Sequence, residues 1–310
     1  MNAIKEKNFI SAVAYVHNAE LALEGFLNSL YSTLNEKFEK FEIICVNDAS
    51  SDGSIGAIKQ LSGKFYNCTL SILNMSYYQG VEAAMQAGVD FAIGDFVFEF
   101  DSTMMDYTPE LIVRIYDRAL QGFDIVSCGT EQMRACSKLF YAVYNRHSGT
   151  QYMIKSETCR VLSRRAINRV HSMSINLPYR KALYSNCGLK VDHIHYKSTQ
   201  NGARRTQTLK NPSETAMTAL ILFTNLAYKI TLVFTLLAML ATLGTVGYVV
   251  TIYLTGNPVE GYTTMMIFMS GAFFAIFTVL SVIIKYLSVM LGLIFNKQRY
   301  IIESIEKVAG

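Results

Sequence analysis

A group of acidic side chains near the middle of the chain is spaced so that it could share a chemical task. In the stretch VFEFDSTMMDYTPE, residues 97–110, a period of two places Glu99 and Asp101 on one face of a short strand, and Asp106 follows in the next loop. Acids at the end of a buried strand could hold a metal ion and a phosphate. The same pattern describes a capped strand end without chemistry, and both interpretations stay open at this point.

Polar side chains also follow the first two apolar segments of the chain. Asn18 comes shortly after the run FISAVAYV, with an acid at Glu20, and Asp48 comes after FEIICVN. A carboxylate in this position can accept hydrogen bonds from a nucleobase N–H or from ribose hydroxyls. Asp and Ser also cap helices and occupy ordinary turns, so a purely structural role for this loop is the alternative.

These loops are positioned by strand and helix patterns that alternate over the first two hundred residues. The strand patterns are FISAVAYV, FEIICV, LSILN, FVFEFD and FDIVSCG, with helical patterns between them. Such alternation predicts an α/β fold with a mostly parallel, Rossmann-like sheet and helices on both faces. Because ligands of these sheets bind beyond the carboxyl ends of the strands, the loops after the first, second and fourth strands are the expected site.

Two long uncharged runs in the last third of the chain, residues 230–254 and 263–284, predict a transmembrane hairpin. Each exceeds the roughly 20 residues that cross a bilayer core. Lys and Arg flank the hairpin but are missing from its loop, so both termini are expected in the cytoplasm. Two buried helices are the alternative. The predicted parts are a catalytic domain (1–210), an interfacial helix (211–229) or an extension of the first span, transmembrane helices (230–254 and 263–285), an external loop (255–262) and a cytoplasmic helix or tail (286–310).

The charge of the chain argues for a membrane surface rather than a nucleic acid. Its net charge is only +4, and no segment has the density of Lys and Arg expected of a nucleic-acid binder, so no nucleic-acid partner is expected. A local basic cluster, Arg204, Arg205 and Lys210, precedes the hairpin and could attract anionic headgroups at about 1 kcal/mol per charge. The same cluster could instead serve only to orient the hairpin. The six cysteines lack metal-binding spacing and are expected to be reduced.

Taken in order, several segments give the chain a family resemblance. YVHNAE, VNDASSDGS, GVEAAMQAGVDFAIGD and FEFDSTMMDYTPELI resemble family 2 glycosyltransferases with the GT-A fold. LFYAVYNRHS, CRVLSRRAINRV, the hairpin with GNPVEGYT and the closing KYLSVMLGLIFNKQRYIIES are similar to the membrane-anchored polyprenyl-phosphate glycosyltransferases. That branch contains bacterial undecaprenyl-phosphate glucosyltransferases and is related to dolichol-phosphate mannose synthases. The resemblance covers nearly the whole chain.

On the donor side, the resemblance implies a nucleotide-sugar site formed by Asn18, Glu20, Asp48 and Gly80. Asp101 falls at the first acid of the family's Asp-x-Asp motif, which holds a divalent metal, Mg²⁺ or Mn²⁺, against the diphosphate. The sequence departs from the motif because Thr103 stands in place of the second acid. We therefore expect Asp101 to act in catalysis and metal binding together with Asp106 or a water, and a structural strand-end acid is the alternative.

On the acceptor side, the resemblance implies that Lys138, Arg160 and Arg164 bind the lipid phosphate. Lys can neutralise a phosphate but lacks the bidentate fork of Arg, so Lys138 would bind less selectively. A phosphomonoester has a second pKa near 6 and is largely ionised at cytoplasmic pH, so a strong general base is not required. The scattered histidines are accordingly expected to be structural.

The resemblance as a whole implies an inverting hexosyltransferase in the cytoplasmic (inner) membrane. It would move a sugar from a UDP-sugar to polyprenyl phosphate, anchored by the hairpin and assembled as a homo-oligomer. Two alternatives remain: an enzyme with a different lipid or glycan acceptor, and a catalytically silent relative that binds nucleotide or lipid phosphate as a scaffold. The incomplete acid motif is the best argument for the silent relative.

Overall fold

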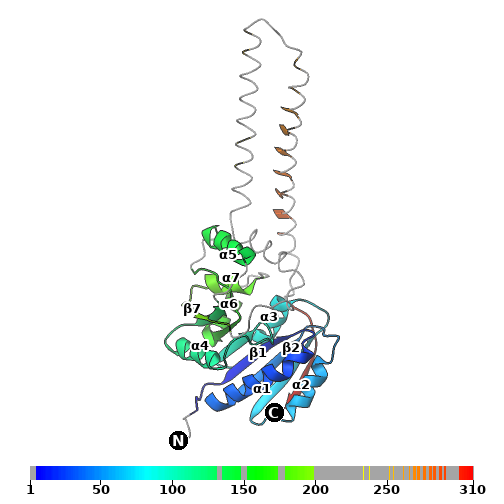
Figure 1. Cartoon of the computed structure of the whole chain (residues 1–310), viewed down its shortest axis with the longest axis vertical. Helices are drawn as coiled ribbons and strands as arrows, with labels where there is room; N and C mark the ends of the chain where they lie inside the picture. Colours follow the sequence, from blue (N-terminus) through cyan, green and yellow to red (C-terminus); the bar gives the residue numbers. More distant parts are fainter. Residues whose placement is uncertain are drawn as a thin grey trace. The chain divides into compact units, whose positions relative to one another are not determined.

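The computed structural model describes residues 5–130, 135–147, 152–173, 179–198 and 300–309, together with isolated positions between 233 and 290. Contacts divide the chain into two units. The first comprises Met1–Asn145, Thr150–Ala216 and Lys297–Gly310, and the second comprises Arg146–Gly149 and Met217–Asn296. All described strands belong to the first unit (Figure 1).

Within the described residues, the first unit is built on one eight-stranded sheet with the order β7-β5-β6-β4-β1-β2-β3-β8. β1 is parallel to β2 and β4, β2 to β3, and β5 to β7, whereas β6 and β8 run antiparallel to their neighbours. The predicted mostly parallel α/β sheet is confirmed. The strands are β1 (Ile10–Val16), β2 (Phe41–Asn47), β3 (Cys68–Met75), β4 (Phe96–Phe100), β5 (Ile125–Thr130), β6 (Cys159–Ser163), β7 (Val191–Tyr196) and β8 (Ile302–Ala309).

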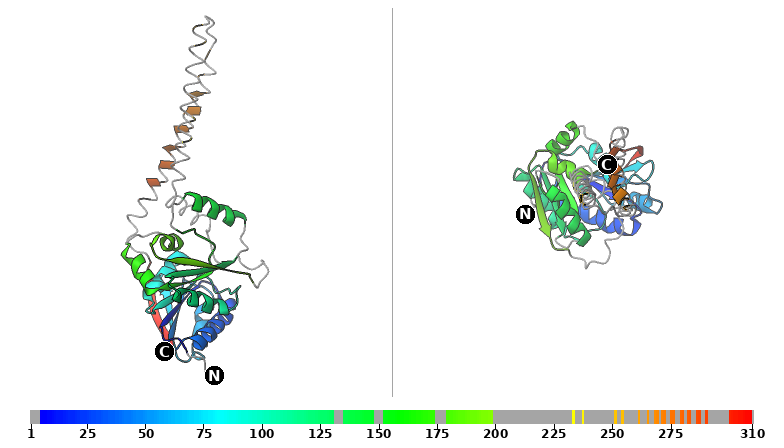
Figure 2. Two further views of the ribbon diagram at one scale, coloured as in Figure 1. Left: turned by 90° about the vertical axis from the view of Figure 1, so that its left-hand side faces the viewer. Right: turned by 90° about the horizontal axis from the view of Figure 1, so that it is seen from above.

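Helices cover both faces of this sheet (Figures 1 and 2). One core contains side chains of α1 (Glu20–Lys37), α2 (Ser54–Ser62) and α4 (Glu110–Leu120), and the other contains side chains of α3 (Val81–Phe91), α6 (Arg164–Ser172) and α7 (Arg180–Asn186). In α1 the buried residues recur at helical spacing, which is why this segment forms an amphipathic helix. They are Leu23, Phe26, Leu27, Leu30 and Leu34. A further helix, α5, spans Ala135–His147.

The strand order creates the place where a ligand is expected. β1 lies between β2 and β4, and the three strands are parallel, so their carboxyl ends share one edge of the sheet. The chain leaves β1 for a helix on one face and enters β4 from a helix on the other, which is the switch in direction where open α/β sheets bind ligands. The loops that begin at residues 17, 48 and 101 therefore meet at this edge.

The end of the chain differs from the predicted helix or tail over 286–310. Residues Ile302–Ala309 form β8, which pairs antiparallel with β3 and covers that edge of the sheet. Pairing satisfies backbone groups that β3 would otherwise present to solvent. From its sequence alone, a short strand at the end of a chain is hard to distinguish from an irregular tail. The strand with which it pairs lies more than two hundred residues earlier.

Among the described residues, no helix has both the length and the apolar character needed to cross a membrane. The predicted interfacial helix and the two predicted spans lie largely outside the described residues. The predicted hairpin and its orientation therefore stay predictions.

Candidate functional site

Asp48 follows β2 directly and is buried at the carboxyl edge of the sheet. Its Oδ1 accepts a hydrogen bond from the N–H of Gln79 at 2.8 Å, and its Oδ2 accepts from the N–H of Gly80 at 2.8 Å and from the Tyr15 hydroxyl at 3.0 Å. Gly80 has φ of 86°, which side chains other than glycine rarely adopt. Asp48 thus ties β2 to the start of α3, and three donors leave about one of its four acceptor positions open.

Asn18 and Glu20 hold the loop after β1 against the loop after β2. Asn18 Oδ1 accepts from the N–H of Ser51 at 2.8 Å, and Glu20 Oε2 accepts from the N–H of Gly53 at 3.0 Å. The N–H of Glu20 donates in turn to Asp52 Oδ2 at 3.1 Å. Both side chains are exposed at this edge. The structure therefore brings Asn18, Glu20, Asp48 and Gly80 into one pair of loops, and their contacts with a nucleotide stay predictions.

Two buried arginines meet the acids of β4. Glu99 is fully buried and accepts from Arg160 Nη1 at 2.6 Å and from Arg180 Nη1 at 2.5 Å. Asp101, with 22% of its side chain exposed, accepts from Arg160 Nη2 at 3.0 Å and from Arg180 Nη2 at 2.8 Å. Each guanidinium thus bridges both carboxylates, and the period-two prediction that these acids share a face is confirmed by their common partners.

Three further side chains extend this cluster. Arg180 also donates through Nε to Glu82 Oε2 at 3.0 Å, the Tyr184 hydroxyl donates to Glu99 at 3.0 Å, and Glu157 Oε2 lies 3.1 Å from Arg160 Nε. Burial by itself would raise the pKa of Asp101, but the adjacent guanidinium groups of Arg160 and Arg180 hold it well below its usual range. Asp101 is therefore a carboxylate throughout the physiological pH range.

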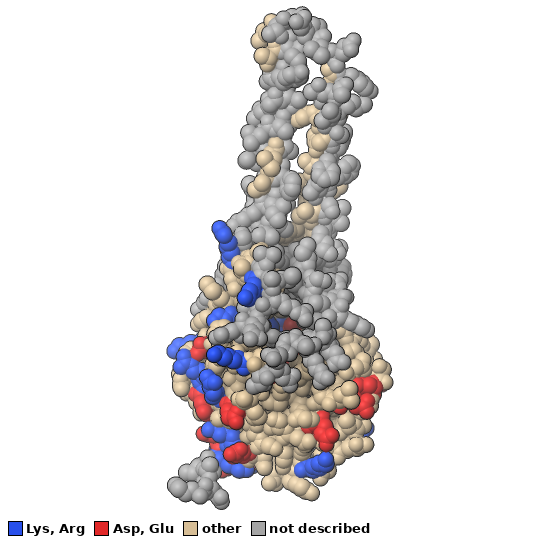
Figure 3. All heavy atoms as spheres, in the orientation of Figure 1, with Lys and Arg blue, Asp and Glu red and all other residues tan. Residues whose placement is uncertain are grey.

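The surface charges behave differently from this cluster. Figure 3 shows one face of the molecule, on which Lys and Arg side chains lie near Asp and Glu side chains. Exposed pairs such as Lys64 with Glu24 are screened by water and contribute at most about 1 kcal/mol. In the buried cluster Glu99, Arg160 and Arg180 have lost nearly all of their water, so their charges depend on protein partners.

Asp106 lies in a separate set of contacts. Its Oδ1 accepts from the Tyr196 hydroxyl at 2.6 Å and its Oδ2 from the Ser198 hydroxyl at 3.3 Å. Thr103, which replaces the second acid of the motif, is buried. Asp106 thus ties the loop after β4 to the end of β7, and among the described residues its hydrogen-bond partners differ from those of Asp101.

The three residues expected to bind a lipid phosphate are not brought together. Lys138 is exposed on α5, and Arg160 is 1% exposed between Glu99 and Asp101. Arg164 donates to the carbonyl oxygens of Ala92 and Gly94 just before β4. Because β6 runs antiparallel to β4, the segment from Arg160 to Arg164 leads to the opposite end of that strand. The predicted membrane-surface residues Arg204, Arg205 and Lys210 lie outside the described residues.

The described residues do not fit a divalent metal in this arrangement. No group of three or more His, Cys, Asp or Glu side chains among them could hold a metal ion. Both oxygens of Asp101 accept from guanidinium groups, and both oxygens of Asp106 accept from hydroxyls. Two cations already beside Asp101 would repel a third positive charge.

Arg180 is the main residue that sequence reasoning missed. It lies in α7, 81 residues after Glu99, in a segment whose sequence, YRKALYSN, has no recognisable motif. The available signal was indirect: Glu99 is an acid in a strand of otherwise apolar residues, and a buried acid requires a cationic partner. That argument predicts a partner but cannot say which Arg or Lys supplies it.

Comparison with known proteins identifies the family of this chain. A model described as glycosyl transferase family 2 matches residues 11–171, just over half of the chain. An uncharacterized glycosyltransferase of Synechocystis is 28% identical over 60% of this chain and 59% of its own length. An undecaprenyl-phosphate 4-deoxy-4-formamido-L-arabinose transferase of Aeromonas hydrophila is 31% identical over 38% of this chain and 35% of its own length. The chain thus spans about three fifths of the first relative and about a third of the second.

Solved structures show a weaker similarity. A mannosyltransferase of Pyrobaculum calidifontis, in complex with GDP-mannose and Mn²⁺, is 12% identical, with 94% of this chain and 89% of that chain covered and a TM-score of 0.48. A glucosyl-3-phosphoglycerate synthase of Mycobacterium tuberculosis is 11% identical, with 69% and 78% covered and a TM-score of 0.49.

Proposed function

Because this chain belongs to glycosyltransferase family 2, we propose that it transfers a sugar from a nucleotide-sugar donor, a UDP-sugar, to polyprenyl phosphate. One observation carries the proposal: the loop pair around Asp48 and the acid cluster around Asp101 lie at the carboxyl ends of β2 and β4, on either side of β1. This is where a parallel sheet binds a nucleotide. The relatives named as undecaprenyl-phosphate transferases support the choice of acceptor.

The proposed reaction needs little acid–base chemistry. An oxygen of the acceptor phosphate attacks the anomeric carbon on the face opposite the diphosphate, and the bond from that carbon to the diphosphate breaks. UDP leaves with the bonding electron pair, and this single displacement inverts the configuration. A phosphomonoester has a second pKa near 6, so this oxygen is already ionised at neutral pH. The chain would then contribute binding and orientation of the two substrates. No step is assigned to a metal, and the predicted Mg²⁺ or Mn²⁺ stays a prediction.

The protein would work at the cytoplasmic face of the inner membrane. Two uncharged runs, residues 230–254 and 263–284, are long enough to span a bilayer, and the basic residues lie outside the loop between them. We propose that this hairpin anchors the enzyme beside its lipid acceptor and contributes to homo-oligomerisation, with Arg204, Arg205 and Lys210 at the headgroups. Accessibility of introduced cysteines to a membrane-impermeant reagent would test the orientation.

Transfer of radiolabel from UDP-sugars into an undecaprenyl-phosphate fraction tests the reaction. We expect the full chain in membranes to label this fraction and Asp48→Asn to reduce labelling, because an amide keeps the size of the side chain but loses its charge. Glu24→Gln, a change at an exposed residue of α1 that pairs with Lys64, is the matched control and should label as the wild type. Equal labelling of lipids without phosphate would contradict the proposed acceptor.

One observation favours a second candidate, a silent relative that binds nucleotide without transfer. Asp101 is neutralised by Arg160 and Arg180, and the motif lacks its second acid. If UDP stabilises the protein against heat but no UDP-sugar transfers label to any lipid fraction, this second function is the correct one.

A further inference from the structure

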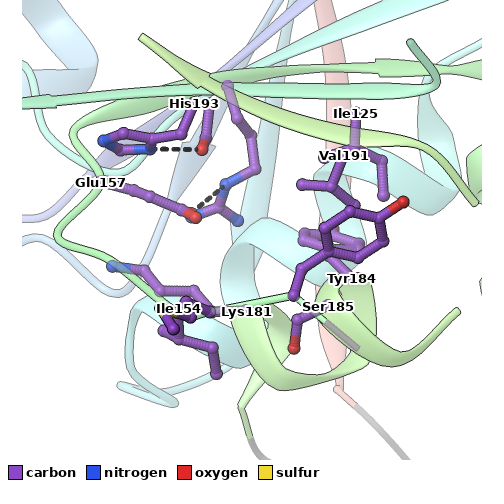
Figure 4. Close-up of a pocket in the computed structure, with 12 residues that line it drawn as sticks. Ile125, Ile154, Glu157, Lys181, Tyr184, Ser185, Val191 and His193 are labelled. Carbon is purple, nitrogen blue, oxygen red and sulfur yellow. Dashed lines mark hydrogen bonds and ion pairs between the residues drawn. The ribbon is translucent and has the colours of Figure 1, made fainter. Parts of the chain in front are cut away.

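A small cavity lies beside the acid cluster, between β5, β7, α7 and the segment 152–157 (Figure 4). Its volume is about 30 Å³, room for roughly two water-sized groups. Figure 4 shows the polar ends of Glu157 and Lys181 and the ring of His193 on one side and Ile125, Val191 and Tyr184 on the other. Met153, which is 75% exposed, also lines the cavity.

Several polar atoms that line this cavity lack a hydrogen bond. Arg160 Nε, Glu157 Oε2 and His193 Nε2 are buried without one, although the first two lie 3.1 Å apart as an ion pair. Within the part of the chain that the structure describes, the Lys181 ammonium makes no hydrogen bond or ion pair. Buried polar groups are satisfied in most native proteins, so a group that supplies both donor and acceptor is expected here.

The charges around the cavity decide which chemistry fits. The charged side chains that line it are two cations, Arg160 and Lys181, and one carboxylate, Glu157. An anion would meet the carboxylate of Glu157, and a cation would meet Arg160 and Lys181. An uncharged hydroxyl avoids both penalties, because it can donate to Glu157 and accept from Lys181 or Arg160.

The imidazole of His193 is also uncharged at neutral pH. Burial and the nearby Lys155 ammonium lower the pKa of His193 to about 3. Its Nδ1 is 2.8 Å from the Ser127 hydroxyl, which leaves Nε2 available to the cavity. The lining therefore offers cationic, anionic and neutral polar partners on one side and apolar side chains on the other.

Resting on the proposed function, we infer that this cavity binds the hydroxymethyl group of a donor hexose and so selects hexoses over pentoses. The methylene would contact Ile125 and Val191, and the hydroxyl would bind Glu157 and Lys181. One guanidinium connects this cavity to the proposed reaction site, because Arg160 donates to Asp101 through Nη2 and presents Nε to the cavity. The volume admits such a substituent but not a whole sugar ring.

UDP-glucose and UDP-xylose test the inference, since they differ only in the hydroxymethyl group. We expect the full-length wild type to bind UDP-glucose about 10- to 100-fold more tightly than UDP-xylose, as for a hydrogen bond to charged partners. Lys181→Met and Glu157→Gln should reduce this ratio to about threefold or less and leave the affinity for UDP unchanged. Lys64→Met, an exposed lysine remote from the cavity, is the matched control and should keep the wild-type ratio.

The outcomes separate the inference from the proposed function. If UDP and both UDP-sugars bind but the wild type does not favour UDP-glucose, or both variants keep the wild-type ratio, the hydroxymethyl site is wrong and the proposed transferase stands. If neither UDP nor any UDP-sugar binds the wild type, the proposed function fails and the inference fails with it. UDP-galactose with UDP-arabinose, a second pair that differs in the same group, should give the same ratio.

Discussion

The two polar regions at the carboxyl edge of the sheet are held together in opposite ways. Around Asp48 the partners are backbone N–H groups and a hydroxyl, which carry no net charge. Around Asp101 the partners are two guanidinium groups that also bind Glu99. The partners of Asp48 do not balance the negative charge of its carboxylate, whereas the two guanidinium groups balance the charge of Asp101. The first region resembles a site prepared for a ligand's donor groups, and the second resembles a buried structural cluster in which Asp101 is partly exposed.

Removing Arg180 should have the largest effect and would test whether the second region depends on its charges. Arg180→Met leaves Glu99, Asp101 and Glu82 short of a buried cation, and we expect a loss of about 3–5 kcal/mol in the free energy of unfolding. Lys64→Met removes a lysine from an exposed pair with Glu24 and should cost at most about 1 kcal/mol. Denaturant unfolding of both variants measures the difference. Similar losses in the two would mean that burial does not distinguish these ion pairs.

Truncating Asp48 should have a smaller effect, because only uncharged donors lose their acceptor. Asp48→Ala strands the N–H groups of Gln79 and Gly80 and should cost about 2–3 kcal/mol in unfolding free energy. Asp48→Asn keeps one acceptor and should cost less. The same denaturant experiment measures both, and a loss for Asp48→Ala as large as that for Arg180→Met would remove the contrast between the regions.

Buried His193, which lies beside the charged region, should make the stability of the protein depend on pH. Its pKa of about 3 lies below the value of about 6.5 expected in the unfolded chain, so between these values the unfolded state binds a proton that the folded state does not. The contribution of neutral His193 is complete above about pH 6.5 and is lost as pH falls toward 3. We expect His193→Gln to show a shallower fall in melting temperature over this range. An unchanged slope would show that the imidazole is not buried as described.

Adding a divalent metal should have the smallest effect on nucleotide binding if Asp101 keeps its ion pairs with Arg160 and Arg180. We expect Mn²⁺ or Mg²⁺ to change the affinity for UDP by less than about threefold, which is under 1 kcal/mol, relative to EDTA. Titration calorimetry with the full chain measures this. A large gain would show that nucleotide binding draws Asp101 away from Arg160 or Arg180, and the predicted metal dependence would then be correct.

Local patterns were sufficient to predict most of the elements. The apolar runs that became β1 and β2, the period-two run of β4 and the leucine spacing of α1 depend on near neighbours in the sequence. The loops that carry Asn18 and Asp48 follow directly from those elements, because parallel strands bring their carboxyl ends to one edge. The strand at residues 302–309 escaped prediction, since it pairs with the edge strand β3, which no local pattern reveals.

The amino-acid sequence alone therefore determined the sheet, its helices and the edge at which polar loops gather. These features depend on periodicity and on short connections. Which charges neutralise one another was decided only in three dimensions. Glu99 meets an arginine 61 residues later and another 81 residues later, and the antiparallel direction of β6 separates Arg164 from Arg160. Coulomb energy depends on the distance between charges in space and on their burial, and neither quantity can be derived from the spacing of residues along a chain.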